Sequence, residues 1–383
     1  MITYSAHADA GDDVRREAIL SRRSPPAAVS WWQRFGISGA REPVRVPGNP
    51  RLHLSSRVCV PIRHGETLLG HMWFVDADES MTEEEIEQAT AVAPELALAL
   101  YAEKVASERA ERRRADAARN VLVGEPDAAA HGADLLVRDG HFEPDRPVAA
   151  LVVRPYLDAG EAPSDELRLA LDSALAAASR RLAPRPAVPL VHFDHGVLLV
   201  AAGAGPTRRA VAECVGSLDE CLAAAPEPLL AEGAVVGVGD PRPALAEARE
   251  SYVEAARAAR LAARGAAAGI GRVAYWSELG VYRLLARLPA DELAGSVVHP
   301  GLDRLLAQPQ GRVLVETLEA YLDCAGSVRA TAERLRLHRQ SLYYRLGRIE
   351  RLASTDLHDG NERLALHLAL RVARVSGRLG ERP

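Results

Sequence analysis

The spacing of apolar residues changes once along this chain of 383 residues, near position 281. Before that point, short apolar runs such as PVAALVV and GVLLVAA have the length of buried strands, and amphipathic segments of helical period alternate with them. After it, segments such as VLVETLEAYLDC and ERLALHLALRVARV show only the spacings of helices. The change predicts a multidomain α+β protein in which mixed α/β domains precede an all-helical C-terminal domain.

Composition narrows the class of protein further. Apolar residues make up 48% and charged residues 26% of the chain, as in soluble globular proteins, and no apolar run has the length of a membrane span. The polar N-terminus has no secretory signal, and the four cysteines show neither a CxxC pair nor zinc-ligand spacing. We therefore expect a cytoplasmic protein with reduced thiols, no metal, no cofactor and no membrane contact. No Ser/His/Asp or Cys/His arrangement is recognisable, so we expect no catalytic residues.

The first domain is predicted to span residues 1–105. RVCVPIRHGETLLGHMWFVDAD has the pattern of two strands joined by a turn, and Thr82 with Glu85 three residues later is typical of a helix capping box. Residues 1–50 are rich in Pro, Gly and Arg and weakly periodic, so we expect loops there. A charged helix with few large apolar residues, over about 106–122, is expected to be exposed and to connect this domain to the next.

The second domain, residues 123–290, alternates predicted strands and helices and includes one hairpin, so we expect a mixed α/β domain. The turn of that hairpin lies at Asp194–Gly196, within VPLVHFDHGVLLVAAG. His192 and His195 flank Asp194, but neighbouring residues of a strand point to opposite faces. We therefore expect no metal site at this turn.

Charge is distributed unevenly along the chain. Residues 311–383 carry 13 arginines and nine acidic residues, a net charge of +4, which leaves −9 for the rest. A basic end on an acidic body indicates an anionic partner for the C-terminal domain. Arginine is used for nearly every positive charge, with Lys104 the single lysine, so arginine content alone does not mark a binding site.

The segment Arg329–Leu352, RATAERLRLHRQSLYYRLGRIERL, combines seven arginines with regularly spaced leucines. Ser327 is a good N-cap for a short helix over 328–335, and His338 begins a second helix after a turn of about three residues. The turn residue Arg336 would cost about 1 kcal/mol in a left-handed conformation. The residues predicted to form the core between the two helices are Ala332, Leu335, Leu337, Leu342, Leu346 and Ile349.

Polar and basic residues occupy the remaining surface of the second helix. Arginine and glutamine make bidentate hydrogen bonds to base edges, while serine, tyrosine and further arginines hold phosphates. The predicted DNA contacts are Arg339, Gln340, Ser341, Tyr344, Arg345 and Arg348. Arg339, Gln340 and Ser341 are the first candidates for contacts to bases, because the N-terminus of such a helix enters the groove first. The alternative is an arginine-coated amphipathic helix within an ordinary bundle.

About 65 residues near the C-terminus resemble the helix-turn-helix of the PucR/CdaR family of bacterial transcriptional regulators. The similar stretches include ETLEAYLD, LHRQSLYYRLGRIE and the closing RLALHLAL. The resemblance implies sequence-specific binding of double-stranded DNA by an oligomer, with the helix-turn-helix domain at residues 300–383.

The other two domains resemble parts of the same regulators. The middle domain is similar to their degenerate GGDEF-like domain, with FDHG where an active cyclase has Gly-Gly-Asp/Glu-Glu-Phe. Only Asp194 and Gly196 remain of that motif, so the resemblance implies no cyclase activity. SRVCVPIRHGETLLGHMWFVDADESMTEEEIE resembles a GAF-type α/β sensor domain whose start is eroded.

These expectations describe a DNA-binding transcriptional regulator that acts as a homodimer or higher homo-oligomer. It would respond, through its first or middle domain, to an unknown small-molecule effector or to a partner. One alternative is a signalling or adaptor protein whose helical C-terminus dimerises instead of binding DNA. Another is a residual nucleotide-processing enzyme.

The last helix has an apolar pattern with two interpretations. Leu364, Leu368, Val372 and Val375 form one stripe, while Leu366 and Leu370 lie off it. The helix is therefore apolar on more than one side. Closing the core of the helical domain and forming a dimer contact are both compatible with this pattern.

Overall fold

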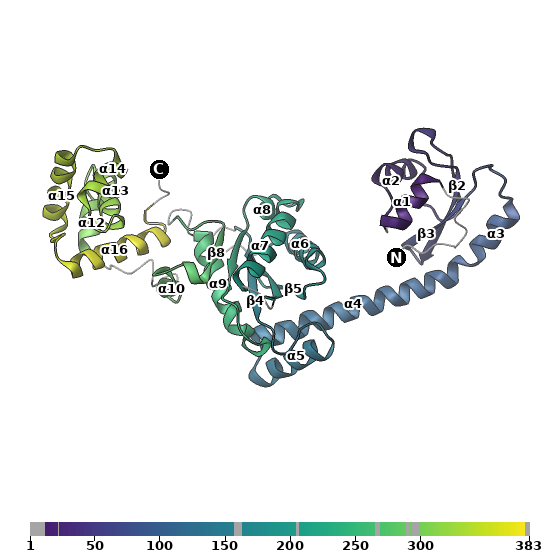
Figure 1. Ribbon diagram of the computed structural model, residues 1–383, viewed down its shortest axis with the longest axis horizontal. Coiled ribbons are helices and arrows are strands. Elements are labelled where there is room, and N and C mark those ends of the chain that lie inside the picture. Colours follow the sequence, from purple (N-terminus) through teal and green to yellow (C-terminus); the bar gives the residue numbers. More distant parts are fainter. Residues whose placement is uncertain are drawn as a thin grey trace. The chain divides into compact units, whose positions relative to one another are not determined.

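The computed structural model describes residues 12–21, 23–156, 163–203, 207–264, 269–288, 292 and 299–379. It divides into two compact units, Met1–Arg113 and Arg114–Pro383, each with its own hydrophobic core (Figure 1). No helix within the described ranges is long and apolar enough to cross a membrane.

The N-terminal unit is built on a three-stranded antiparallel sheet in the order β1-β2-β3. Its elements are α1 (Asp13–Ser21), α2 (Pro26–Gln33), β1 (Val44–Val46), η1 (Pro50–Leu52), β2 (Arg57–His64), β3 (Thr67–Val75), α3 (Glu83–Ala91) and the first part of α4 (Ala93–Val123). The β2–β3 hairpin confirms the predicted pair of strands. The capping box of Thr82 and Glu85 is also confirmed, because both of its hydrogen bonds are present.

The prediction that residues 1–50 are loop-rich is wrong for residues 13–21 and 26–33, where α1 and α2 lie, and residues 1–11 and 22 lie outside the described residues. Trp32 of α2 packs on Trp73 of β3 with ring centroids 4.5 Å apart, and the guanidinium of Arg57 lies over both rings. Arg57 also forms a buried ion pair with Asp12. These contacts between distant residues stabilise helices that are too short and too weakly periodic to be recognised from sequence.

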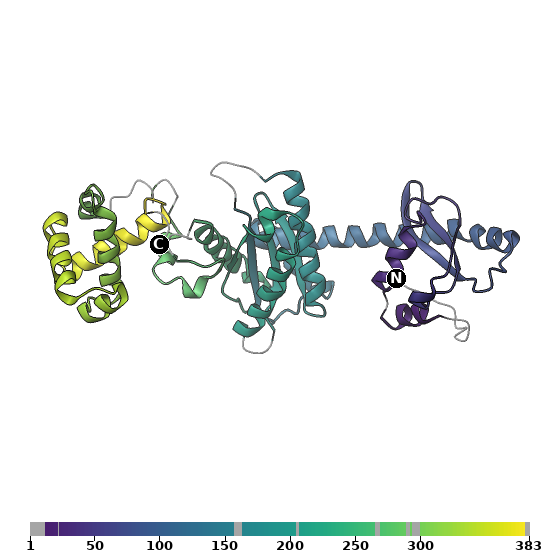
Figure 2. The same cartoon turned by 90° about the horizontal axis from the view of Figure 1, so that it is seen from above.

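The second unit begins with a mixed α/β domain around a five-stranded sheet in the order β5-β6-β4-β7-β8 (Figures 1 and 2). The strands are β4 (Val148–Arg154), β5 (Ala187–His192), β6 (His195–Ala201), β7 (Val235–Val238) and β8 (Val273–Tyr275). Neighbouring strands are antiparallel except for β7 and β8, which are parallel. The predicted hairpin is confirmed as β5–β6.

Helices cover both faces of this sheet. They are α5 (Pro126–Arg138), α6 (Asp165–Leu182), α7 (Thr207–Ala223), α8 (Pro228–Ala231), α9 (Ala248–Arg264) and α10 (Tyr282–Leu285), with the short turns η2 (Leu245–Glu247) and η4 (Trp276–Glu278). One hydrophobic core lies between the sheet and α6 and α7, and another lies between the sheet and α4, α5 and α9. β4 contributes to both cores through alternate residues, because successive side chains of a strand point to opposite faces.

The end of α4 belongs to the second of these cores. Arg112 and Arg113 are exposed, as predicted for a connecting helix. Ala118, Val121 and Leu122 are at most 1% exposed and pack under the sheet. The prediction of an exposed helix is therefore wrong for these last turns. Ala117 and Ala118, together with Val121 and Leu122, bury one face of this helix against the sheet although only two of the four side chains are large.

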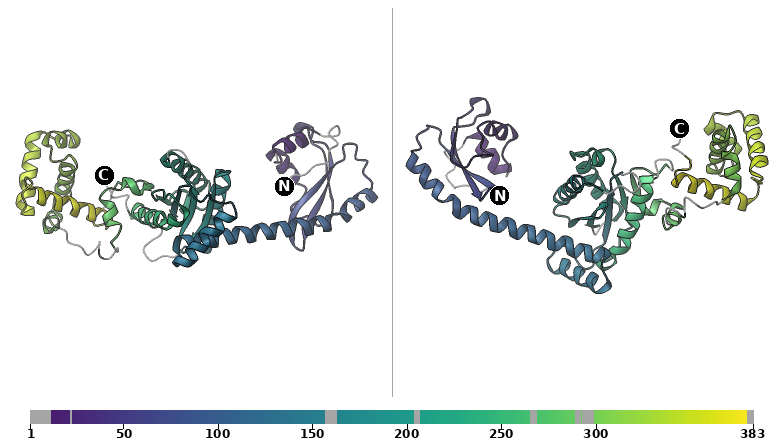
Figure 3. Two further views of the ribbon diagram at one scale, coloured as in Figure 1. Left: turned by 60° about the horizontal axis from the view of Figure 1, so that its bottom comes forward. Right: turned by 180° about the vertical axis from the view of Figure 1, so that it is seen from behind.

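The chain ends in an all-helical domain, as its apolar periodicity predicts (Figure 3). We call it the helical domain. Its helices are α12 (Pro300–Leu306), α13 (Gly311–Asp323), α14 (Val328–Leu335), α15 (Arg339–Ala353) and α16 (Gly360–Val375). All five contribute to one hydrophobic core, which leaves the outer side of α15 free for another role.

Candidate nucleic-acid interface

α14 and α15 form two short helices joined by a tight turn. The side chain of Ser327 accepts a hydrogen bond from the N–H of Ala330 at 3.3 Å and so caps α14, as a serine at this position favours. Arg336 ends α14 in the left-handed region, with φ 52° and ψ 42°. His338 then caps α15, because its Nδ1 accepts from the N–H of Gln340 at 3.4 Å.

The inner side of α15 anchors it to the rest of the helical domain. Leu342 and Ile349 are fully buried, and Leu346 is 7% exposed. Ala332 of α14 lies in the same core. The other two predicted core residues, Leu335 and Leu337, are half-buried at the turn. Three leucine and isoleucine side chains at spacings of four and three therefore fix which side of α15 faces outward.

The outer side of α15 begins with three exposed polar residues, Arg339, Gln340 and Ser341. Tyr344 follows one turn later and is 68% exposed. Tyr343, which sequence reasoning missed, is 61% exposed beside it. At 100° per residue, Tyr343 lies on the flank opposite Ser341. The helical period alone could therefore have placed Tyr343 on the exposed surface of α15.

Arg345 and Arg348 lie on the flank of α15 that faces α13, and both are half-buried. Arg345 donates a hydrogen bond to Oγ1 of Thr317 at 3.3 Å, and Arg348 donates to Oε1 of Gln310 at 3.0 Å. A groove runs along this flank, lined by Gln310, Val313, Leu314, Gln340, Ser341, Tyr344, Arg345 and Arg348. The two arginines are thus oriented by neutral partners that leave their charge intact.

Ion pairing divides the arginines of this domain into two groups. Six of them pair with a carboxylate, namely Arg312, Arg329, Arg334, Arg371, Arg374 and Arg378. Among the described residues, those without a carboxylate within ion-pair distance are Arg304, Arg336, Arg339, Arg345, Arg348, Arg351 and Arg363, and five of these seven lie in α15 or at the turn before it. Positive charge therefore remains unneutralised on this side, as binding to phosphate requires.

The C-terminal end of α15 is held by Arg304, a residue that sequence reasoning missed. Its guanidinium donates to the carbonyl oxygens of Leu352, at 3.2 Å, and of Ala353. These carbonyls belong to the last turn, where no intrahelical partner exists. Arg304 lies in α12, outside the segment whose pattern pointed to the two helices, so no local signal indicated its role.

Two family models match the chain. The PucR C-terminal helix-turn-helix domain matches residues 314–372, which include α14, α15 and most of α16, and the GGDEF-like domain matches residues 109–261. The chain is therefore similar to PucR-type transcriptional regulators in its helix-turn-helix region and in its middle domain.

PucR-type relatives match over both long and short ranges. The DNA-binding transcriptional activator AdeR of Bacillus subtilis is 21% identical over 97% of this chain and 87% of its own length. The proline-responsive transcriptional activator PutR of the same organism is 22% identical over 94% of this chain and 87% of its own. The purine catabolism regulatory protein of B. subtilis is 34% identical over 25% of this chain and 18% of its own. Similarity over nearly the whole chain extends beyond the helix-turn-helix.

In this regulator the polar residues at and around the β5–β6 turn bind one another. The carboxylate of Asp194 pairs with Arg154 and with Nδ1 of His195, at 2.8 Å to the latter. Nε2 of His195 lies 3.0 Å from the hydroxyl of Tyr252 on α9. Burial would raise the pKa of Asp194, but the hydrogen bond from His195 and the charge of Arg154 outweigh it and lower this pKa. Burial lowers the pKa of His195, although Asp194 opposes that shift.

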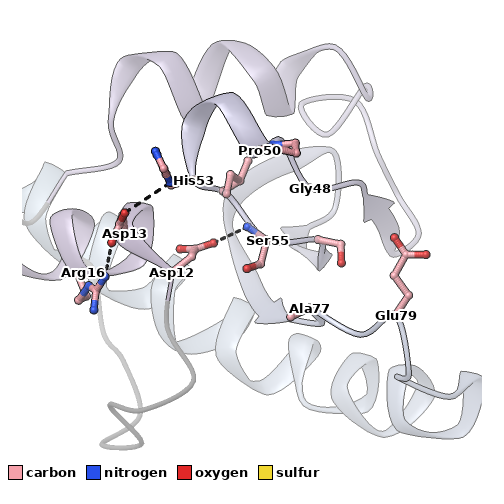
Figure 4. A pocket seen from close by; sticks show the side chains of 11 residues that line it. Asp12, Asp13, Arg16, Gly48, Pro50, His53, Ser55, Ala77 and Glu79 are labelled. Carbon is pink, nitrogen blue, oxygen red and sulfur yellow. Dashed lines mark hydrogen bonds and ion pairs between the residues drawn. The ribbon is translucent and has the colours of Figure 1, made fainter.

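The N-terminal unit of the regulator has a polar depression (Figure 4). It is lined by Asp12, Asp13, Arg16, Gly48, Pro50, His53, Leu54, Ser55, Ser56, Ala77 and Glu79. Asp12 accepts from the N–H of Ser55 at 2.8 Å and pairs with Arg57, while Asp13 pairs with Arg16. The carboxylates of Asp12 and Asp13 are therefore occupied by neighbours. The polar lining of the depression differs from the apolar lining typical of cofactor pockets.

Proposed function

We propose that this DNA-binding transcriptional regulator holds double-stranded DNA against the outer side of α15. The observation that carries the proposal is the pairing pattern of the arginines. Among the described residues, none of the five arginines on α15 or at the turn before it has a carboxylate partner, whereas six of the eight elsewhere in the helical domain do. A phosphate-binding arginine must keep its charge available, and a carboxylate partner would neutralise that charge.

The side chains take different roles according to their place on α15. Arg339, Gln340 and Ser341 stand exposed at the N-terminal end, where they can reach base edges in the major groove. Arg345 and Arg348 lie on the flank and are oriented by Thr317 and Gln310, so they are suited to phosphates. The exposed hydroxyl groups of Tyr343 and Tyr344 add phosphate or sugar contacts. Arg304 keeps the far end of the helix in place.

Regulation follows from having two such helices in a homodimer or higher homo-oligomer. Both helices occupy DNA only if their spacing matches half-sites about 34 Å apart, one turn of the double helix. A small-molecule effector or a partner that binds the N-terminal or middle domain would shift the population of correctly spaced oligomers. The relative PutR, named as proline-responsive, supports a small-molecule effector. The protein would act in the cytoplasm.

The middle domain is proposed to act without catalysis. The GGDEF-like match covers it, but the acidic residue left at the turn, Asp194, is held by Arg154 and His195. A carboxylate in that state is not available to a metal-bound nucleotide. Incubation of the purified protein with GTP and magnesium should therefore yield no cyclic product, and formation of one would contradict this part of the proposal.

The DNA contact is tested by recovering fragments of the source genome with the purified full-length protein. The variants are Arg339→Ala and, as a matched control, Arg378→Ala, which removes an arginine paired with Asp303. We expect the wild type and the control to recover fragments that share one inverted motif, and Arg339→Ala to lose them. Equal recovery without sequence preference by all three proteins would overturn the proposal and favour an adaptor whose helical domain only dimerises.

A further inference from the structure

α16 belongs to two hydrophobic cores at once. Leu366, Ala369, Leu370 and Ala373 pack into the core of the helical domain. Val372 and Val375, with Leu368 at the edge, pack into a different cluster that is built mostly from the middle domain. The two apolar sides noticed in the sequence thus have two different partners within this chain.

The middle domain supplies the larger share of the second cluster. Its members are Val235, Ala258, Leu261, Ala262, Ala274, Trp276, Leu279 and Leu285, from α9, the last two strands, η4 and α10. Trp276 is 1% exposed, and Val372 and Val375 are 3% and 2% exposed. We call this packing of α16 on the middle domain the α16 contact. It removes apolar side chains from water, which makes it a favourable association.

Polar groups extend the α16 contact toward the two DNA-binding helices. Arg371 of α16 donates to the hydroxyl of Tyr282 in α10 at 3.3 Å. The same guanidinium pairs with Asp323 at the end of α13, and Asp323 also pairs with Arg334 of α14 at 3.3 Å. A continuous series of polar contacts therefore joins the middle domain to the first helix of the helix-turn-helix.

The α16 contact contains one buried polar group without a hydrogen-bond partner among the described residues. The contact also leaves the outer side of α15 exposed to solvent. The buried group is Nε1 of Trp276. A buried donor in that state costs free energy, so the contact is weaker than its apolar area alone would give. Arg339, Gln340 and Tyr344 remain exposed while the contact is made, so it does not block DNA.

We propose that the α16 contact is the device through which the middle domain sets the orientation of the helical domain. This rests on the proposed function of α15. With the contact closed, the two helical domains of an oligomer are held at the spacing that a two-site operator needs. With it open, each helical domain binds a half-site independently. A signal that reaches α9, η4 or α10 would act by shifting this equilibrium.

The test uses full-length variants made on both sides of the contact. Leu368→Asp changes the α16 side of the contact. Leu285→Asp changes the α10 side and leaves every residue of the helical domain as it is. Leu169→Asp is the matched control, because Leu169 lies on α6, away from the α16 contact and from the apolar stripe of α16, and is 68% exposed. Affinity is measured for a duplex carrying both half-sites of the recovered motif and for a duplex carrying one. Hydrogen exchange of the peptide containing Trp276 reports whether the contact has opened.

We expect Leu368→Asp and Leu285→Asp to weaken binding to the two-site duplex by about tenfold or more, because linked sites gain on the order of 10² to 10⁴ in affinity over single ones. Binding to the one-site duplex should change less than about twofold, and exchange at Trp276 should rise. The Leu169→Asp control should match the wild type in every measurement.

Unchanged or increased two-site affinity in Leu285→Asp would overturn the proposal, whatever Leu368→Asp does. If Leu368→Asp also weakens binding to the one-site duplex, the substitution has damaged the helical domain itself. In that case only the result for Leu285→Asp tests the proposal. Failure of the wild type to bind either duplex would instead contradict the proposed function of α15, so the two failures can be told apart.

Discussion

The outer side of α15 and the β5–β6 turn carry similar chemistry but use it differently. Both present arginine, aromatic and hydrogen-bonding groups at the surface of a domain. At the β5–β6 turn, Arg154, Asp194, His195 and Tyr252 satisfy one another. On α15, the arginines have neutral partners or none, and Tyr344 is mostly exposed.

The difference teaches that the availability of polar groups, more than their identity, separates a binding surface from a structural one. A charge that is paired inside the protein must be released before it can bind a ligand, and that release costs free energy. α15 needs no such release, whereas the turn would have to break its internal bonds before holding a nucleotide or metal ion.

The largest expected effect tests which side of α15 faces inward. Leu342→Ala removes a fully buried side chain and should lower the free energy of unfolding of the helical domain by about 2–5 kcal/mol. The adjacent Tyr343→Ala changes an exposed side chain and should alter it by less than about 0.5 kcal/mol. Urea denaturation followed by circular dichroism measures both. Similar losses in the two variants would mean that α15 is rotated.

The next effect separates the two regions by function. Arg339→Ala should weaken binding to the recovered DNA motif by about 1–3 kcal/mol, as expected for loss of a bidentate base contact, and leave stability unchanged. Arg154→Ala should leave DNA affinity unchanged and destabilise the middle domain by roughly 0.2–1 kcal/mol, because Asp194 loses a partly exposed ion pair. A fall in DNA affinity in Arg154→Ala would contradict the structural role given to the β5–β6 turn, because it would place the turn in the DNA-binding surface.

A smaller effect depends on pH. Burial lowers the pKa of His195, so the folded protein resists a proton that the unfolded chain accepts below about pH 6.5. Stability of the middle domain should therefore fall as pH decreases below that value, by no more than about 1.4 kcal/mol per pH unit for this one group. His195→Gln should reduce the slope but not remove it, since burial also lowers the pKa of His192. Calorimetry between pH 7.5 and 5 gives the slope, and an equal slope in the variant would contradict this assignment.

The smallest effect concerns Gly347, in the middle of α15. A Cβ added there would meet no atom within 4 Å. Gly347→Ala should therefore raise helix stability by about 0.5–1 kcal/mol, because alanine loses less conformational freedom. DNA affinity should stay within about twofold if the N-terminal end of α15 makes the principal contacts. A more stable variant with much weaker binding would show that the DNA backbone approaches Gly347 itself.

Much of the helical domain could be predicted from sequence because its determinants are local. Leu342, Leu346 and Ile349 repeat at helical spacing, and Ser327 caps α14 through a residue three positions away. The family resemblance pointed to the same segment as a helix-turn-helix, and the model of the PucR C-terminal helix-turn-helix domain matches it. The β5–β6 hairpin was predictable for the same reason, since its strands and turn are contiguous.

Contacts between distant residues could not be predicted. Trp32 stabilises α2 by packing on Trp73, and Arg304 holds the end of α15 from a helix about 50 residues earlier. The partners of Arg345 and Arg348 come from α13 and the residue before it. The second apolar side of α16 could be recognised from the spacing of its residues. The spacing could not predict that this side packs on the middle domain.

The most direct test of the account is the salt dependence of DNA binding. Affinity of the wild type, Arg348→Ala and Arg378→Ala for the recovered motif is measured across salt concentrations. The account predicts a steep loss of affinity with salt for the wild type, a slope shallower by about 0.9 for Arg348→Ala, and an unchanged slope for Arg378→Ala, which is paired with Asp303. A wild-type affinity that is insensitive to salt, or one slope shared by all three proteins, would contradict the claim that the unpaired arginines of α15 hold the DNA.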